Sequence, residues 1–356
     1  MGVFAGPEIT ESGLVLALDG ANKKSFYGYW SGSYGTAANA FDGNLNTFSG
    51  GAGGTFSATY TFNNGLDVSG TVRVYVTFGA SSGQVNGRTG VILIDGIDIS
   101  SKMDAANVYA SSPGWVDVTS EVGSIFNTVV LNGTSGSTNP SIAAIEVNGQ
   151  ILVGTTWAGT AWTDLSTNGN TGTLVNGVGY SASNGGSLSF DGSNDYVLLT
   201  RNDFNTSLPN FTISVFVYKI SDGIILGNHR HNQTWESVWL STTEFTVNDA
   251  NGTANRQTLY HTTPINSWMN LVAVNNSSQN YMKVFLNGAE IATKTATVIP
   301  WNSSIIPTIG ANLLAGDLSP VGPINGRISN TSIYNRALSA AEISQNFNAL
   351  KGRFSI

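Results

Sequence analysis

Short runs in which apolar and polar residues alternate fill most of the chain, and they predict β-strands. Residues 72–78 (Val-Arg-Val-Tyr-Val-Thr-Phe) place every second side chain on one face, and residues 211–218 and 282–286 follow the same rule. A period of two is typical of strands with one buried face. Asn287-Gly288 predicts a type I′ hairpin turn, because both central residues of that turn need a positive φ. Repeated Asp-Gly and Asn-Gly turns indicate antiparallel β-sandwiches.

These runs fall into two β-rich regions, and one helix is predicted at the end of the chain. The expected strands are residues 58–62, 72–78, 90–96, 114–118, 128–131 and 142–149 in the first region, and 187–190, 211–218, 269–274 and 282–286 in the second. The helix is expected at about residues 339–351, where Ser339 and Glu342 form a capping box. Ile343, Phe347 and Leu350 would share the face that docks on a sheet, and Gly352 would end the helix.

Composition narrows the function classes. The chain has 356 residues, of which 42 are glycine and only 10% are charged, and its formal charge is −7. An acidic chain disfavours nucleic acid as a partner, and no apolar run is long enough for membrane insertion. The first residues have neither a basic nor an apolar segment, so no secretory signal is expected. With no cysteine in the chain, disulfides and thiolate metal sites are excluded.

Five segments carry sequence motifs: Leu14 to Phe26, Thr160 to Leu174, Ser187 to Val197, Ile333 to Ser339 with Glu342-Ile343, and Gln345 to Phe354. These motifs resemble the laminin-G-like, concanavalin-type jelly roll that is common in virion proteins of tailed bacteriophages, particularly marine and cyanobacterial ones. In that family the first two motifs lie within a few residues of each other, whereas about one domain's length separates them here. The resemblance therefore implies residues 1–26 and 155–356 as the jelly roll and 27–154 as an insertion. The insertion would begin with a loop-like run of glycine, serine and aromatic residues.

The inserted region resembles, more weakly, a discoidin-like or galactose-binding-like sandwich. Residues 40–47 near its start and Ile145 to Gly149 near its end carry this resemblance. In such modules the Asp-Gly loop often holds calcium, which would place Asp42 and Thr47 at a metal site. Ala144 stands where the family usually has Glu before the Ile-Glu-Val run. A structural Asp-Gly turn without a cofactor is therefore the favoured interpretation, with calcium as its alternative.

Catalysis is not expected. Glycoside hydrolysis needs a pair of carboxylates across a cleft. Concanavalin-type hydrolases carry them as Glu-x-Asp-x-x-Glu on one strand, and this chain has no such run. The acidic residues of the second region stand mostly beside Gly or Asn, which is typical of turns. The sequence therefore predicts a protein that is not an enzyme.

Candidate binding residues are a histidine pair and several aromatic residues. His229 and His231 could share a face of a strand and bind a metal ion, but a polar loop that touches a partner is favoured. Tyr29, Trp30 and Trp235 could stack on sugar rings, with core or inter-domain packing as the favoured alternative.

The resemblance implies a non-enzymatic virion structural protein: a capsid decoration, a capsid fibre or a tail-fibre component, located on the released particle. Its expected partners are other virion proteins, host-surface glycans and further copies of itself, since exposed sheet edges need covering. The alternative is a free-standing carbohydrate-binding lectin, or the binding module of a glycan-degrading enzyme.

Overall fold

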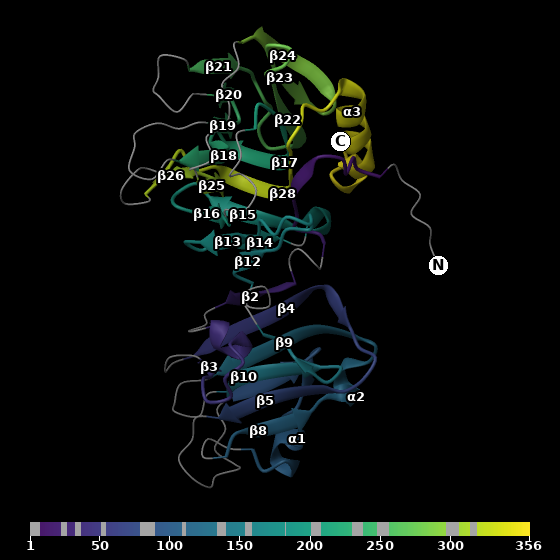
Figure 1. Cartoon of the computed structure of the whole chain (residues 1–356). Coiled ribbons are helices and arrows are strands. Elements are labelled where there is room, and N and C mark those ends of the chain that lie inside the picture. The colour runs from purple at the N-terminus through teal and green to yellow at the C-terminus, as the bar shows by residue number, and fades with distance from the viewer. Residues whose placement is uncertain are drawn as a thin grey trace. The chain divides into compact units, whose positions relative to one another are not determined.

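The chain forms two compact units in the computed structural model (Figure 1). Unit 1 comprises Met1–Ser25 and Trp162–Ile356, and unit 2 comprises Phe26–Ala161. The structure describes residues 8–22, 27–32, 37–50, 55–78, 90–108, 112–133, 140–153, 159–181, 183–200, 208–229, 238–247, 256–296, 306–313 and 319–356. Unit 1 is therefore assembled from two separate stretches of the sequence.

Two eight-stranded antiparallel sheets form the framework of unit 1 within the described residues. The first, here called the β28 sheet, has the order β14-β15-β28-β17-β22-β23-β24, with β1 also paired to β28. Its strands are β1 (Leu14–Asp19), β14 (Gly179–Ser181), β15 (Ser187–Asp191), β17 (Asn210–Ser221), β22 (Trp268–Asn276), β23 (Tyr281–Leu286), β24 (Ala289–Thr295) and β28 (Asn325–Tyr334).

The second sheet, here called the β25 sheet, has the order β12-β13-β16-β25-β18-β19-β20-β21. Its strands are β12 (Ala161–Trp162), β13 (Gly172–Val175), β16 (Tyr196–Leu199), β18 (Ile224–His229), β19 (Val238–Ser241), β20 (Glu244–Val247), β21 (Gln257–Tyr260) and β25 (Ile306–Ile309). The short strands β26 (Asn312–Leu313) and β27 (Pro320–Val321) pair with each other.

Strand β28 joins the two stretches of unit 1. One edge pairs along its length with β17. On the other edge, β15 pairs with the first half of β28 and β1 with the second half, so β1 and β15 lie end to end. Leu16 and Leu18 of β1 are fully buried. A strand from the start of the chain thus completes a sheet whose other strands all follow residue 178.

A row of apolar side chains crosses the β25 sheet and contributes to the core. Cross-strand pairing aligns, in order, Val197, Ile309, Leu226, Leu240, Phe245 and Leu259, and all six are buried. Side chains on one face of neighbouring strands pack directly against each other. The strands predicted in this region, residues 187–190, 211–218, 269–274 and 282–286, correspond to β15, β17, β22 and β23 of the β28 sheet. The predicted hairpin at Asn287 (φ 50°) and Gly288 (φ 79°) is confirmed.

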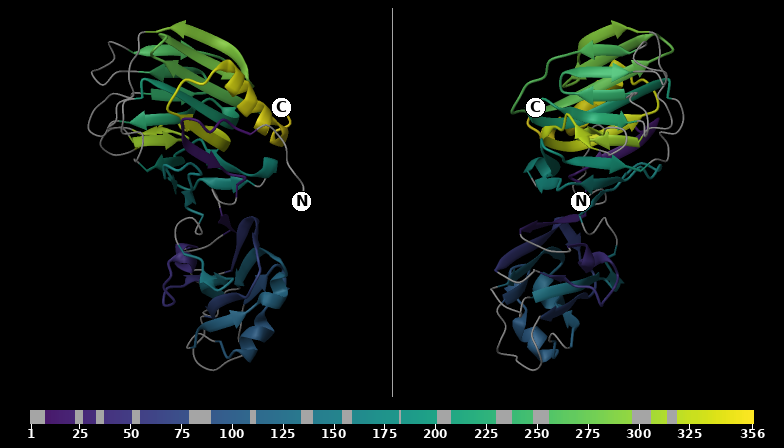
Figure 2. Two further views of the ribbon diagram at one scale, coloured as in Figure 1. Left: turned by 45° about the vertical axis from the view of Figure 1, so that its right-hand side comes forward. Right: turned by 90° about the vertical axis from the view of Figure 1, so that its left-hand side faces the viewer.

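Helix α3 (Ala340–Leu350) covers one face of the β28 sheet (Figure 2). The predicted capping box is confirmed, because Ser339 accepts from the Glu342 backbone N–H and the Glu342 side chain accepts from the Ser339 backbone. Phe347 stacks on Phe216 of β17 at 6.5 Å between ring centroids. The predicted stop at Gly352 is wrong: the helix ends at Leu350 and continues as a 3-10 turn over Lys351–Arg353. No helix among the described residues is long and apolar enough to cross a membrane.

Unit 2 contains two five-stranded antiparallel sheets around their own core. The β10 sheet has the order β11-β10-β5-β8 with β3 also paired to β10, and the β9 sheet has the order β2-β4-β9-β6-β7. Between them lie buried apolar side chains, among them Tyr60, Val74 and Phe126. The strands are β2 (Gly28–Gly32), β3 (Ser49–Gly50), β4 (Phe56–Asp67), β5 (Val72–Phe78), β6 (Gly90–Ile94), β7 (Ile97–Asp98), β8 (Gly114–Asp117), β9 (Ile125–Gly133), β10 (Pro140–Val147) and β11 (Gln150–Ile151).

Two details of unit 2 differ from the sequence expectations. The run beginning at Gly28 is strand β2, paired with β4, and not a loop. Two short helices, α1 (Ser100–Ala105) and α2 (Thr119–Val122), were not predicted, because each is too short to show a helical period. The 3-10 turns are η1 (Ala37–Phe41) and η2 (Ser183–Gly185). The predicted all-β class, with a second β-sandwich and one short C-terminal helix, is confirmed.

Candidate functional site

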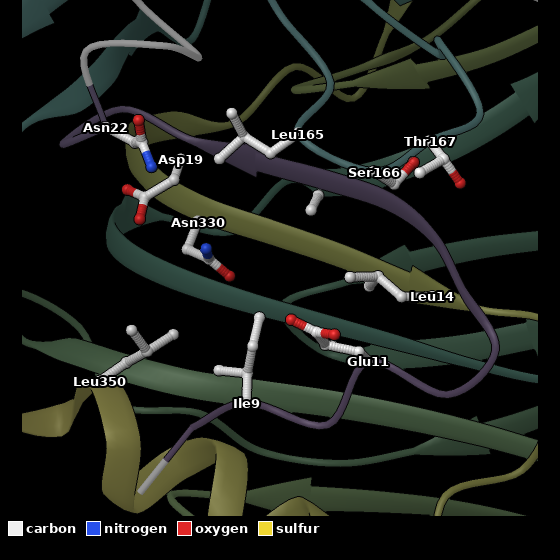
Figure 3. A pocket seen from close by; sticks show the side chains of 11 residues that line it. Ile9, Glu11, Leu14, Asp19, Asn22, Leu165, Ser166, Thr167, Asn330 and Leu350 are labelled. Carbon is white, nitrogen blue, oxygen red and sulfur yellow. The ribbon is translucent and has the colours of Figure 1, made fainter. Parts of the chain in front are cut away.

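A cavity of unit 1 with a volume of about 510 Å³ lies beside β1 (Figure 3). Six segments contribute to it: the residues before β1, β1 itself, the turn after β1, the loop after β12, strand β28 and the end of α3. The lining residues are Ile9, Glu11, Leu14, Ala17, Asp19, Asn22, Leu165, Ser166, Thr167, Asn330 and Leu350. Cavities of this size suit a small ligand.

The pairing of β1 with β28 decides which side chains face the cavity. Asp19 lies directly opposite Asn330, so both side chains project on the same face of the sheet. Leu16 and Leu18 alternate with these positions and point into the core, where neither is exposed. The alternation that buries the leucines therefore presents a carboxylate and an amide to the cavity.

Asp164 fixes the loop after β12 along the edge of β1. Its carboxylate accepts hydrogen bonds from the backbone N–H groups of Ala17, Ser166 and Asn170, each at 2.9 Å. It also accepts a hydrogen bond from the Ser166 hydroxyl at 2.7 Å. The Leu165 N–H donates to the Ala17 carbonyl at 2.8 Å. Asp164 is 8% exposed, so this network lies largely out of water and holds the cavity wall in place.

Asp19 is tied to the end of the chain by an ion pair. Arg353 Nη1 lies 2.9 Å from Asp19 Oδ2, and Arg353 Nη2 donates to the Ser329 hydroxyl. Asp19 Oδ1 accepts from the Ala21 N–H at 2.9 Å. The guanidinium neutralises this carboxylate, so Asp19 acts here as a fixed hydrogen-bond acceptor.

Glu11 supplies the second carboxylate of the cavity and is exposed. Its segment is fixed at two points: the Thr10 N–H donates to Asn346 Oδ1 at 2.8 Å, and the Leu14 N–H donates to the Glu11 carbonyl. In Figure 3 the Glu11 side chain projects into the space between the N-terminal segment and Leu14. A rim carboxylate in this position can accept hydrogen bonds from a ligand.

Amide and hydroxyl groups complete the polar part of the lining. Asn330 is 6% exposed, and its Oδ1 accepts from the Ser332 hydroxyl at 3.3 Å. The Ser166 hydroxyl donates to Asp164, as described above, and Thr167 stands exposed at the rim. Apolar contacts come from Ile9, Leu14, Leu165 and Leu350. Polar groups fixed around apolar side chains can bind a neutral molecule that carries several hydroxyls.

The structure places the predicted calcium residues in a closed turn of unit 2. Asp42 Oδ1 accepts from the Asn44 N–H at 2.7 Å, and Asp42 Oδ2 accepts from the Thr47 hydroxyl. Among the described residues, no three His, Asp or Glu side chains gather as a metal site. The calcium hypothesis for Asp42 and Thr47 stays a prediction.

Of the other predicted site residues, the structure describes the side chains of Tyr29 and Trp30. Trp30 lies on β2 and packs against Tyr60 of the unit 2 core, with ring centroids 5.2 Å apart. Tyr29 precedes it on the same strand. His229 ends β18, where its backbone pairs with Ile306, and its side chain lies outside the described residues. His231 and Trp235 also lie outside the described residues.

A row of aromatic residues on the β10 sheet was not singled out from the sequence. Tyr75 pairs across strands with Trp115, and their rings meet edge to face at 5.3 Å, while Phe48 stacks on Tyr75 at 6.2 Å. Ala144 is the cross-strand partner of Tyr75 on β10 and is fully buried. Trp115 also lines a more open cavity of about 390 Å³. The alternation in residues 72–78 predicts on which face of the sheet the Tyr75 side chain lies. The sequence does not show which aromatic residues of other segments lie beside it on that face.

Comparison with known proteins agrees with the architecture of unit 1. Residues 191–344 match the family model of the concanavalin A-like lectin/glucanases superfamily. Together with the two packed sheets, this match shows a concanavalin-like fold, as the jelly-roll motifs had predicted. No curated protein matches the chain.

Solved structures that the chain resembles include binding domains of botulinum neurotoxins. They are the serotype D ligand binding domain with N-acetylneuraminic acid (TM-score 0.40, 15% identity, 52% of this chain and 47% of that one), the DC binding domain with SialylT (0.41, 16%, 57% and 49%) and the serotype C1 binding domain (0.42, 18%, 57% and 50%). The chain spans about half the length of these structures. Similarity at this level assigns no ligand to the chain.

Proposed function

We propose that this chain is a non-enzymatic glycan-binding protein and that the cavity beside β1 holds a sugar. The observation that carries the proposal is the convergence of Asp19, Asn330 and Ser166 beside apolar side chains in a space of about 510 Å³. Sugars present several hydroxyls around an apolar ring, and such a lining satisfies both parts. The lectin part of the matched family description fits this proposal.

Binding without hydrolysis is the version that we favour. A glycosidase needs one carboxylate as an acid and another as a base or nucleophile. Of the two carboxylates that line the cavity, Asp19 is engaged by Arg353. Arg353 Nη1 lies 2.9 Å from Asp19 Oδ2 and the Ala21 N–H donates to Oδ1, so both oxygens of this carboxylate are already held by the protein.

The setting that we propose is the surface of a bacteriophage particle, as a capsid decoration, a capsid fibre or a tail-fibre component. Its support is the resemblance of residues 14–26, 160–174 and 345–354 to virion proteins of tailed phages. The partners would then be other virion proteins and further copies of this chain. Imaging of the parent particle tests this setting: density for two linked β-sandwiches on the capsid or tail is expected, and a particle without such density contradicts it.

A free-standing lectin is the second candidate, favoured by the family match alone. The two candidates differ in assembly. A virion component is expected to co-purify with particles on a density gradient, whereas a lectin stays in the soluble fraction while binding the same sugars.

The test of sugar binding uses an array of immobilised oligosaccharides and the full-length chain. We expect saturable binding to a subset of glycans, weakened about tenfold by Glu11→Gln, which removes the charge of a rim acceptor, or by Thr167→Ala, which removes a rim hydroxyl, since each change costs about 1–1.5 kcal/mol. Glu290→Gln is the matched control. Glu290 lies on β24 in a partly exposed ion pair with Lys283, which contributes little to stability. Equal binding by all four proteins would show that the sugar binds elsewhere.

A further inference from the structure

The turn between β15 and β16 carries oxygen-bearing side chains at alternate positions: Asp191, Ser193 and Asp195. Asp191 and Ser193 are exposed, whereas Asp195 is only 4% exposed. Asp195 Oδ2 accepts from the Asp191 N–H at 3.0 Å. Asp195 Oδ1 is buried and has no hydrogen-bond donor among the described residues. Half of a buried carboxylate is thus left without compensation.

Such an oxygen is costly in its charged form. A buried carboxylate oxygen loses its hydrogen bonds to water, and without a donor in the protein no other hydrogen bond replaces them. Burial therefore raises the pKa of Asp195; the Asp191 N–H opposes this rise, and the negative charge of Asp191 adds to it. Either a bound proton or a bound cation can compensate the buried negative charge of Asp195. The Asp191 carboxylate is near enough to act on Asp195 electrostatically, and a divalent cation would offset both charges, whereas one proton offsets only one.

A second turn lies against the unpartnered oxygen. Residues 176–178 link β13 to β14, and the Asn176 side-chain amide donates to the Asn194 carbonyl at 2.9 Å. A methyl group added at Gly177 would lie 3.9 Å from Asp195 Oδ1. Gly177 has a positive φ of 97°, which suits glycine. Backbone of the β13–β14 turn therefore lies within reach of the same point as the carboxylate.

We propose that Asp195 and Asp191, with main-chain oxygens of these two turns, bind a calcium ion. Calcium accepts six to eight oxygen ligands in flexible geometry, whereas magnesium needs a near-ideal octahedron. Two turns that contribute carboxylate and carbonyl oxygens fit the first requirement better than the second. The ion would bind the β13–β14 turn to the β15–β16 turn within unit 1. This inference is independent of the proposed glycan site, because it shares no residue with the cavity beside β1.

Asp42 provides the comparison within the same chain. Both of its carboxylate oxygens already accept hydrogen bonds, from the Asn44 N–H and the Thr47 hydroxyl. Asp42 is also exposed, so water can stabilise its charge. A cation would therefore stabilise Asp195 more than it would stabilise Asp42, whose Asp-Gly loop was the site predicted from the sequence.

The experiment titrates CaCl2 into the full-length chain after treatment with EDTA, with isothermal calorimetry for stoichiometry and thermal unfolding for stability. We expect one calcium ion per chain, a higher melting temperature with calcium, and binding at least about tenfold weaker for MgCl2. Terbium in place of calcium should show luminescence sensitised by Tyr196, which adjoins Asp195.

Three variants separate this site from other carboxylates. Asp195→Asn should abolish the calcium-dependent rise in melting temperature. Asp191→Asn, at an exposed position where the Asn oxygen can still accept from the Ser193 N–H, should weaken calcium binding about tenfold. Asp42→Asn should bind calcium as the unaltered chain does. The proposal is overturned if the unaltered chain binds no calcium at millimolar concentration, or if Asp191→Asn leaves its affinity unchanged.

Discussion

At the scale of single residues, Asp164 connects the two parts of the interrupted sequence motif. Its carboxylate accepts backbone N–H groups from both β1 and its own loop, across 147 residues of sequence in the case of Ala17. The motifs at residues 14–26 and 160–174 therefore form one local structure, and the same structure makes one wall of the cavity. An aspartate suits this position because a carboxylate accepts several donors at once.

We predict that Asp164→Asn lowers the free energy of unfolding by about 2–3 kcal/mol, because it weakens several charge-assisted bonds and leaves a buried N–H without an acceptor. Urea unfolding measures this loss. Ser166→Ala is the graded control, since it removes a single donor to the same carboxylate and should cost about 1 kcal/mol. Equal stability of Asp164→Asn and the unaltered chain would contradict the role given to Asp164.

Some cavity residues lie in motifs that the sequence shows, whereas others lie on a strand that the sequence pattern does not predict. Asp19 and Ser166 belong to recognisable motifs. Asn330 lies on β28, whose run Asn-Gly-Arg-Ile-Ser-Asn-Thr-Ser-Ile-Tyr lacks clear apolar alternation, and no strand was predicted there. That strand nevertheless lies between two others, and its buried polar groups are satisfied locally; the Ser329 hydroxyl, for example, donates to the Gly186 carbonyl. Tertiary pairing overrides the weak local signal.

At the scale of elements, the start of α3 could be predicted because capping depends on local residues. Ser339 and Glu342 satisfy each other's backbone N–H groups, as their spacing indicates. Arg336 was recognised only as part of a motif. It donates both terminal nitrogens to Glu342 and its Nε to the Ser12 carbonyl, which fixes the N-terminal segment beside α3.

This arrangement predicts a specific response to acid. The Arg336 guanidinium, together with the Ser339 groups, lowers the pKa of Glu342 to about 2. An unfolded chain has a Glu pKa near its ordinary value of about 4.3. Because the folded pKa is the lower one, the stabilisation is fully present above about pH 5 and is lost as the pH falls toward 2.

Glu342→Gln should therefore be less stable than the unaltered chain at neutral pH, and the difference should shrink between pH 5 and pH 2. Chemical unfolding at a series of pH values measures it. Glu290→Gln should show a much smaller difference at every pH, since its pair with Lys283 is partly exposed. A difference for Glu342→Gln that stays constant down to pH 2 would rule out the carboxylate as its source.

At the scale of the whole molecule, two compact units with separate cores suggest that each can fold alone. Apart from Ala161 at the start of β12, both β-sheets of unit 1 draw their strands from unit 1, and the unit 2 core consists of unit 2 residues. We predict that a chain with residues 26–160 replaced by a short Gly-Ser linker folds with a single cooperative transition, as does the excised segment. Calorimetry and circular dichroism measure both. Failure of both pieces to fold, while the intact chain does, would contradict an insertion between independent units.

The central claim is that the cavity beside β1 holds a sugar. It is tested most directly by determining the structure of the intact chain with the glycan that binds most tightly on the array. We expect the sugar among Asp19, Asn330 and Ser166, with its apolar side against Leu14 or Leu165. A sugar found instead on the aromatic row of Phe48, Tyr75 and Trp115, or no glycan bound at all, would contradict the claim.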